Sequence, residues 1–263
     1  MKPRTGPRAG EGRALQKPAA VISIDVEQDC PPYLSSWRGV EEGLPRLLQL
    51  FEEEKVRATL FATGETYQRY PALMRKALEA GHELAVHGYR HERLDKLPPG
   101  DAARAVEKAT AAAEKVIGSR PVSFRAPNLQ MPPTLYPVLS RLGYRYDSSR
   151  ALYKPPFQRR PWFISGVLVV PATVTSSVLR LPWRIQSRIH RLLPRLRVYF
   201  SHPWEYIDMR GAGVRWDCRF NTGERAVELL RKLIRWLRSQ GYRLLTLAEL
   251  GAELEEVLRR EKG

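Results

Sequence analysis

The side chains in this sequence that are best suited to chemistry stand at or just past the ends of predicted strands. They are carboxylates, imidazoles and one guanidinium: Asp25, Glu27, His87, His91, Arg125, Asp147 and His202. The chain has five histidines, and three of them belong to this set. In a parallel barrel, functional side chains gather at the C-terminal ends of the strands, so we expect these residues to share one site.

His87 and His91 are separated by three residues in the sequence HGYRH. A turn after a strand can bring such a pair onto one face, where two imidazole nitrogens are free to bind a metal. Two histidines and one carboxylate are the usual ligands of a hydrolytic zinc with an open position, and either Glu27 or Asp29 could supply the carboxylate. The alternative is that His87 is a satisfied core residue and His91 lies on the surface.

Asp25 closes an apolar strand, where a carboxylate is costly unless it is paired or functional. Paired carboxylates in one site suit a division of labour, in which one binds a metal and the other accepts a proton from the attacking water. Arg125, in the sequence SFRAPN, could hold such a base ionised through a bidentate contact. The alternative for Arg125 is an ordinary arginine before a proline turn.

His202 ends another predicted strand, and Pro203 stops regular structure directly after it. A histidine in this place could act as a general acid or stabilise an oxyanion. The ring of Trp204 would suit stacking on a sugar face, although a tryptophan can equally be a core residue.

Strands and helices alternate from residue 20 onward. Strands are predicted at 20–25, 57–63, 83–87, 122–125, 144–147, 166–171, 197–201 and 242–246, and helices at 41–55, 71–80, 101–117 (with Asp101 as N-cap), 133–142, 224–240 and 247–260. This alternation, without repeats or an internal linker, predicts one catalytic domain over residues 20–263. Seven or eight units over about 240 residues favour an α/β fold, a distorted parallel (β/α) barrel of about seven strands.

Residues 1–19 are rich in proline, glycine and basic residues and have no apolar segment of the kind found in secretory signals. We expect a disordered basic arm, with a tether for nucleic acid or lipid as the alternative. No stretch of about 18 apolar residues is present that would span a membrane, so we expect a cytoplasmic protein. Cys30 and Cys218, which are the two cysteines, are too few for a disulfide framework.

The positive charge is concentrated in two segments. The 44 basic and 28 acidic residues give a net charge of +16, of which residues 1–20 carry +4 and residues 141–200 carry +11. Residues 180–197 contain six arginines and no acid, and they predict an amphipathic helix between Pro182 and Pro194. Its cationic face indicates either an ordinary solvated helix or peripheral contact with an anionic membrane at its inner face. A nucleic-acid partner is disfavoured, because it would not explain the acids and imidazoles at the strand ends.

Six stretches of this sequence carry a resemblance to a known family. They are SIDVEQD (23–29), TLFATGE (59–65), GHELAVHGYRHE (81–92), FRAPN (124–128), LGYRYDSS (142–149) and SHPWEYID (201–208). Over residues 20–250 the chain resembles the polysaccharide deacetylases of the NodB-homology type (carbohydrate esterase family 4). The DVE and HPWE pieces are most similar to the subgroup associated with bacterial exopolysaccharide loci. The resemblance implies a distorted barrel that removes acetyl groups from N-acetylated sugars with one divalent metal, usually zinc.

The resemblance also implies roles for individual residues. Asp25 matches the general base, Arg125 the arginine that orients it, and His202 the catalytic acid. His87 and His91 match the two metal-binding histidines.

The sequence departs from the family pattern in its first motif, and the usual fourth motif with its Asp-Trp is not clear. Val26 follows Asp25 where the usual first motif has adjacent aspartates, so Glu27 would be the third ligand, with Asp29 as its rival. Asp147 is a candidate for a substrate-site residue that supports His202, and Trp183 is a weaker one. The alternatives to an N-deacetylase are a hydrolase of another, cyclic amide and a non-catalytic basic binding module.

Overall fold

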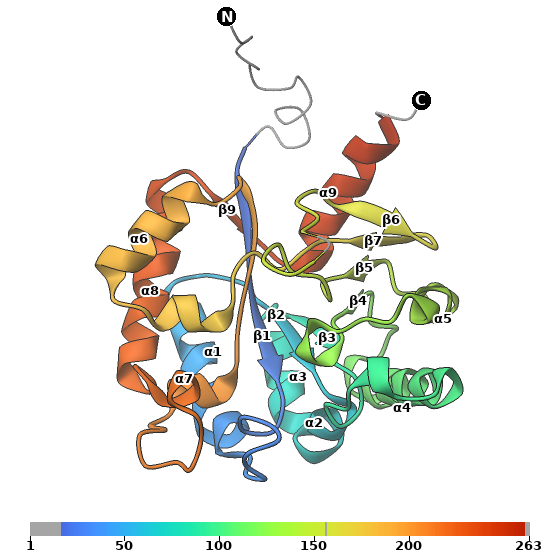
Figure 1. The fold of residues 1–263 in the computed structure, drawn as a ribbon, viewed down its shortest axis with the longest axis horizontal. Helices are drawn as coiled ribbons and strands as arrows, with labels where there is room; N and C mark the ends of the chain where they lie inside the picture. The colour runs from blue at the N-terminus through green and yellow to red at the C-terminus, as the bar shows by residue number, and fades with distance from the viewer. Residues whose placement is uncertain (1–16, 156, 261–263) are drawn as a thin grey trace, which may run out of the picture.

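The computed structural model describes residues 17–155 and 157–260. Most of the predicted N-terminal arm therefore lies outside the described residues. Within this part of the chain, nine strands form one sheet in the order β6-β7-β5-β4-β3-β2-β1-β8, with β9 also paired to β1 (Figure 1). The strands are β1 (Ala19–Val26), β2 (Thr59–Ala62), β3 (Glu83–Val86), β4 (Ser123–Phe124), β5 (Tyr146–Asp147), β6 (Trp162–Ile164), β7 (Val167–Val169), β8 (Leu196–Ser201) and β9 (Arg243–Leu245).

The sheet is parallel apart from one hairpin at its edge. β6 runs antiparallel to β7, and Ile164 pairs with Val167 across a two-residue turn. Ser165 and Gly166 both have positive φ in this turn, as a tight hairpin of right-handed twist requires. The sequence did not predict β6.

The far edges of the sheet approach each other beyond β7. The backbone N–H of Thr173 donates to the Val198 carbonyl of β8 at 2.8 Å, and the Val198 N–H donates to Thr173 Oγ1 at 2.7 Å. These contacts close the curled sheet at β8, which among the described strands pairs only with β1. The prediction of a distorted (β/α) barrel is confirmed, with an antiparallel strand added.

Helices surround the sheet. They are α1 (Leu44–Glu53), α2 (Gly64–Arg69), α3 (Pro71–Glu79), α4 (Pro99–Ile117), α5 (Tyr136–Arg141), α6 (Trp183–Leu192), α7 (Trp216–Arg219), α8 (Glu224–Ser239) and α9 (Leu247–Arg260). The prediction of Asp101 as the N-cap of α4 is wrong, because this helix begins one turn earlier, with Pro98 as its N-cap. No helix in the described ranges combines the length and the apolarity needed to cross a membrane.

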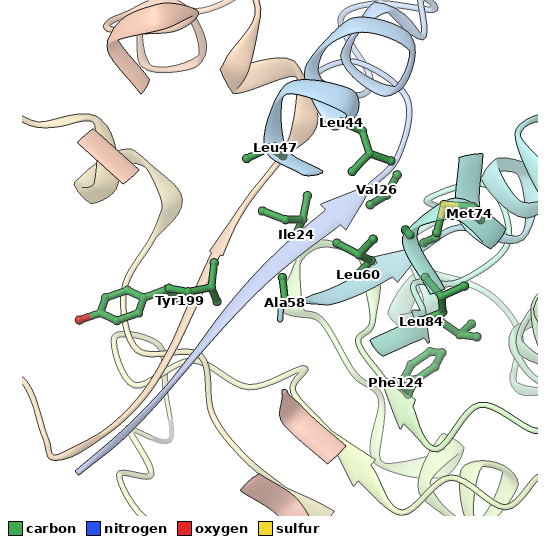
Figure 2. Packing of buried hydrophobic residues seen from close by; sticks show 14 of the residues in the cluster. Ile24, Val26, Leu44, Leu47, Ala58, Leu60, Met74, Leu84, Phe124 and Tyr199 are labelled. Atoms are coloured by element: carbon green, nitrogen blue, oxygen red, sulfur yellow. The ribbon is translucent and has the colours of Figure 1, made fainter. Parts of the chain in front are cut away.

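The main hydrophobic core lies between the sheet and the helices. Ile24 and Val26 of β1 contact it together with Leu60 of β2, and α1 adds Leu44 and Leu47 (Figure 2). Side chains alternate along a strand, and Ile24 and Val26 both face this core. Position 25, which lies between them, therefore faces the barrel interior. This alternation places Asp25 inside the barrel.

Leu60→Ala should lower the free energy of unfolding by about 2–5 kcal/mol, because Leu60 is fully buried and its removal leaves a cavity. Leu192→Ala is the matched control, since Leu192 is 87% exposed and its loss should change stability by less than about 0.5 kcal/mol. Urea unfolding measures both. Equal destabilisation by the two substitutions would contradict this core.

Candidate active site

A cavity of about 340 Å³ lies at the C-terminal ends of the strands, and we call it the site cavity. It is lined by six of the candidate residues, namely Asp25, Glu27, His87, His91, His202 and Trp204. Arg125 lies directly behind Asp25 and is fully buried. The structure therefore brings together seven of the eight residues that the sequence singled out as catalytic, metal-binding or substrate-binding.

Arg125 holds Asp25 in place from below. Its Nη1 donates to Asp25 Oδ1 at 2.6 Å and to Ser23 Oγ at 2.8 Å. Its other nitrogens donate to Ser148, and its guanidinium lies 4.0 Å from the centre of the Phe61 ring. The contact with Asp25 involves one carboxylate oxygen, whereas the sequence suggested a bidentate pair. The second oxygen, Oδ2, is left facing the cavity 3.9 Å from His87 Nε2.

The two histidines of HGYRH are turned towards each other by the backbone. Gly88 and His91 both have positive φ, which reverses the chain directly after β3. The two imidazole rings lie 5.4 Å apart. His87 Nδ1 lies 2.8 Å from the Arg125 carbonyl oxygen, which can only accept, so Nδ1 donates and Nε2 is the nitrogen available to a ligand.

Glu27 completes a set of three metal-type ligands. One ligand atom from each of Glu27, His87 and His91 lies within 4.8 Å of the others. Glu27 Oε2 is 2.9 Å from His91 Nε2 and 3.2 Å from His87 Nε2. This oxygen is buried, and although the two imidazole nitrogens lie close to it, none of the described residues donates a hydrogen bond of acceptable geometry to it. A buried unpaired carboxylate oxygen is costly, and a divalent cation between these three atoms would satisfy it.

The charge state of Glu27 also suits a metal. Burial raises the pKa of Glu27, but the neighbouring His91 and His87 outweigh burial and hold it well below its usual value. The Glu27 carboxylate is therefore ionised at neutral pH, as a metal ligand must be.

Asp29 faces away from this cluster. Its Oδ1 accepts a hydrogen bond from the Gly39 N–H at 2.8 Å, and its Oδ2 accepts one from Ser36 Oγ at 2.7 Å. A side chain at Gly39 would have its Cβ 2.6 Å from Asp29 Oδ1 and 2.5 Å from the Trp204 backbone nitrogen. Asp29 therefore folds the loop after β1, and the geometry favours Glu27 over Asp29 as the third ligand.

His202 is held by a carboxylate that the sequence interpretation did not assign. Its Nδ1 lies 2.7 Å from Glu205 Oε1, three residues further along in the short helix Pro203–Tyr206. Burial lowers the pKa of His202, but the carboxylates of Glu205 and Glu27 raise it to about 9. His202 is thus protonated at neutral pH, with Nε2 3.7 Å from Glu27 Oε1. The signal was present in HPWE, since a carboxylate three residues after a cap position can bond back to the cap.

Glu205 is in turn fixed by Arg180. Arg180 Nε donates to Glu205 Oε2 at 2.6 Å, and both side chains are buried. The two remaining nitrogens of Arg180 donate to the carbonyls of Phe220 at 2.8 Å and Asp217 at 2.7 Å. The charge of Arg180 lowers the pKa of Glu205 against the effect of burial.

Asp147 and Trp183 do not take the place that the sequence suggested for them. Asp147 is fully buried, accepts hydrogen bonds from the Tyr136 hydroxyl at 3.0 Å and from Ser149, and does not line the site cavity. Burial raises its pKa to about 6. Trp183 packs edge-on against Trp236, with ring centres 6.3 Å apart. Neither residue is therefore the partner of His202. That partner is Glu205.

Trp204 lines the site cavity but is only 5% exposed. Its indole stacks on the His202 imidazole, with centres 5.0 Å apart and planes inclined by 16°. One face of the indole is therefore covered by protein. Two more exposed aromatic residues, Tyr33 and Tyr153, also line the cavity, and the sequence interpretation did not select them.

Residues 18–146 match the family model described as polysaccharide deacetylase. This segment belongs to the polysaccharide deacetylase family. The matched residues of this deacetylase-family segment include the three metal-type ligands, Asp25 and Arg125. His202 and Glu205 lie beyond the matched segment and are placed by the geometry alone. Nothing separates the exopolysaccharide subgroup from other members, and that assignment stays a prediction.

Curated relatives of this polysaccharide deacetylase-family segment match part of the chain. It is 32% identical over 109 residues to the peptidoglycan deacetylase-like protein FGM2 of Gibberella zeae, covering 41% of this chain and 32% of FGM2. It is 30% identical over 125 residues to the peptidoglycan deacetylase of Helicobacter pylori, covering 46% of this chain and 42% of that protein. The chain thus spans less than half the length of these relatives.

Solved structures share the fold at low sequence identity. A Mycobacterium smegmatis protein superposes with a TM-score of 0.69 at 20% identity, covering 93% of this chain and 92% of its own. The family 4 carbohydrate esterase of Streptomyces lividans, solved with acetate, gives 0.59 at 16% identity over 86% and 91%. A family 4 pseudoenzyme from Bacillus anthracis gives 0.60 at 17% identity over 90% and 66%. Since one of these proteins is a pseudoenzyme, the fold by itself does not decide activity.

Glu205→Gln should lower the pKa of His202 from about 9 towards its ordinary value of 6.5, because the carboxylate beside Nδ1 loses its charge. In the native protein the raised pKa means that protonated His202 contributes stability that is complete below about pH 6.5 and is lost as pH rises through about 9. NMR titration of the imidazole in metal-free protein measures the pKa, and urea unfolding at several pH values measures the stability.

The control for this variant is Glu228→Gln, which removes an exposed carboxylate paired with Arg225. It should leave the His202 titration where it is. A His202 pKa that is the same in the Glu205→Gln variant and in the native protein would contradict the assigned pairing.

Proposed function

We propose that residues 20–263 act as one catalytic domain, a metal-dependent hydrolase that removes N-acetyl groups from an N-acetylated polysaccharide or glycan intermediate. The observation that carries the proposal is the unpaired buried oxygen of Glu27 beside two imidazole nitrogens, with the Asp25–Arg125 pair adjacent. Family membership and the names of the curated relatives support the same reaction class.

The three ligand residues and their surroundings suit a divalent metal, and we propose zinc, bound by Glu27, His87 and His91. A zinc ion bound there supplies a Lewis acid for the acetyl carbonyl and lowers the pKa of the attacking water. The Nε2 atom of His87 is already oriented, because the Arg125 carbonyl fixes the His87 ring. This preorganisation reduces the rearrangement that metal binding requires.

Asp25 is the proposed general base. Its Oδ1 is bonded to Arg125, and its Oδ2 faces the cavity beside the ligand residues. The buried guanidinium holds Oδ1 through a charge-assisted hydrogen bond, which leaves Oδ2 to accept the proton of the attacking water. On this proposal Arg125 orients the base and does not touch the substrate.

His202 is the proposed general acid. Glu205 accepts a hydrogen bond from the Nδ1–H group of His202. The proton on Nε2 therefore points towards the cavity and can be donated to the leaving amine. The raised pKa of His202, about 9, keeps this proton in place at neutral pH. On this proposal Asp25 accepts a proton and His202 donates one.

The two other functions weighed from the sequence make different demands. A hydrolase of another amide would use the same base, acid and metal on a different substrate. A binding module would not need the buried Asp25–Arg125 and Glu205–Arg180 pairs, which hold two ionisable groups in defined positions and are costly to bury. These pairs favour catalysis over binding alone.

Asp25→Asn should reduce acetate release from an N-acetylated oligosaccharide by at least about a hundredfold while the protein retains its metal.

Glu27→Gln should lose the metal, and Asp29→Asn is its control, because Asp29 bonds to Gly39 and Ser36 and not to the histidines. Elemental analysis and acetate assays measure the two properties. Full activity in Asp25→Asn would refute the proposed base. Bound metal without acetate release in the unaltered protein would indicate another amide, and neither metal nor acetate release would indicate a binding module.

We also propose that α6 makes peripheral contact with an anionic membrane. Its outer face carries four exposed arginines, Arg184, Arg188, Arg191 and, just beyond the helix, Arg195, for which the described part of the chain provides no ion pair. Ile185 and Leu192 are 47% and 87% exposed on the same helix. Exposed apolar side chains among unpaired cations are typical of a helix that lies in a membrane interface.

Replacing Arg184, Arg188 and Arg191 together by glutamine should weaken binding to vesicles of phosphatidylglycerol and phosphatidylcholine by about tenfold to a hundredfold, because each cation contributes up to about 1 kcal/mol at an anionic surface. Sedimentation with vesicles at low and high salt measures the binding. The charge-matched control replaces three exposed, ion-paired arginines on other elements, Arg104, Arg141 and Arg210. Equal binding by the two triple variants would refute the contact.

A further inference from the structure

A second cavity, of about 680 Å³, opens beside the site cavity, and we call it the side cavity. The two share four lining residues, namely Pro31, Tyr33, His91 and Asn128. His91 is one of the three metal-type ligands, so the side cavity begins at the proposed reaction centre. A chain of linked sugars with one unit in the site cavity would therefore place a neighbouring unit in the side cavity.

The wall of the side cavity is cationic. Arg90 and Arg93 line it, and none of its described lining residues is an aspartate or a glutamate. Arg93 is paired with Asp95, which lies outside the lining, at 2.6 Å. The exposed guanidinium of Arg90 has no carboxylate partner among residues 17–155 and 157–260; its described contact is with the Tyr89 ring, 5.7 Å from the ring centre.

Lys154 adds a third cation where the two cavities meet. It lines the site cavity, and its Nζ donates to the backbone carbonyl of Asn128, a residue shared by both cavities, at 3.1 Å. Burial and the positive charge of Arg93 lower the pKa of Lys154. Asp95 balances the charge of Arg93, and Glu92 accepts a hydrogen bond from the Arg90 backbone N–H, so the positive charge offered to a ligand in this corner comes mainly from the Arg90 guanidinium and Lys154.

The remaining lining groups suit a sugar. Tyr33 is 48% exposed and can present an apolar ring face while its hydroxyl stays in water. Gln28, Ser35 and Asn128 provide polar groups around it. Arginine recognises a carboxylate or a phosphate through paired, charge-assisted hydrogen bonds, which a neutral hydroxyl cannot replace.

We propose that the side cavity binds an anionic group next to the N-acetylated sugar, either a carboxylate of the adjoining unit or a phosphate linked directly to that sugar. The inference rests on the proposed function and narrows its substrate class to acidic glycans and phosphorylated glycan intermediates. Arg90 and Arg93 act as specificity residues, and the reaction centre itself is unchanged by them.

The test compares charged ligands with neutral counterparts of the same shape. One pair is an oligosaccharide of alternating N-acetylglucosamine and glucuronic acid and its carboxyl-reduced form. The other is N-acetylglucosamine 1-phosphate and N-acetylglucosamine. Calorimetry on the full chain carrying Asp25→Asn measures binding without turnover. The charged member of at least one pair should bind about tenfold more tightly, and the pair that shows this preference identifies the source of the anion.

Adding Arg90→Gln and Arg93→Gln should reduce that preference to less than about threefold. Arg104→Gln with Arg141→Gln removes the same charge outside both cavities and should retain the preference. Equal affinity for charged and neutral ligands in both pairs would overturn the inference, as would a preference that survives in the Arg90 and Arg93 variant. Because binding is read without turnover, a protein that prefers the anion but releases no acetate would refute the proposed function and leave this subsite standing.

Discussion

The buried ion pair between Arg125 and Asp25 is the contact on which the rest of the site depends. Removing one partner of such a pair typically costs about 3–5 kcal/mol, because an uncompensated charge stays buried. Arg125 also fixes His87, because its backbone carbonyl accepts a hydrogen bond from the Nδ1–H group of that residue. A single residue after a two-residue strand therefore sets the proposed base and one metal ligand relative to each other.

Much of the site could be predicted because strand geometry is periodic. Asp25 is on the inward face of β1, whose outward face carries Ile24 and Val26. His87 and Arg125 directly follow β3 and β4, which are the second and third strands along from β1 in the same parallel sheet. The choice between Glu27 and Asp29 could not be made in this way. Both have the same parity as Asp25, but β1 ends at Val26, and beyond that residue the loop decides where each side chain points.

The failures of prediction have a common physical cause, which is that short turns and closing contacts leave little trace in hydrophobic periodicity. Glu205 reaches His202 through a single helical turn, and β6 is a three-residue strand ordered by its hairpin. Asp147 does end a strand, as predicted, but the Tyr136 hydroxyl and Ser149 occupy its oxygens. Position at a strand end places a side chain near the site; its local partners decide whether it takes part.

Arg180 connects the shape of the site cavity with the acidity of the His202 imidazole. The same planar group that holds Glu205 also holds the carbonyls of Asp217 and Phe220, at the two ends of the segment around α7. If that segment moved outward with Asp217 and Phe220 still bonded to Arg180, the guanidinium would turn away from Glu205. Such a movement would take the positive charge of Arg180 away from Glu205. The Glu205 carboxylate would then interact more strongly with His202, and His202 would bind its proton more tightly. The position of the segment around α7 and the proton affinity of His202 are therefore coupled through Arg180.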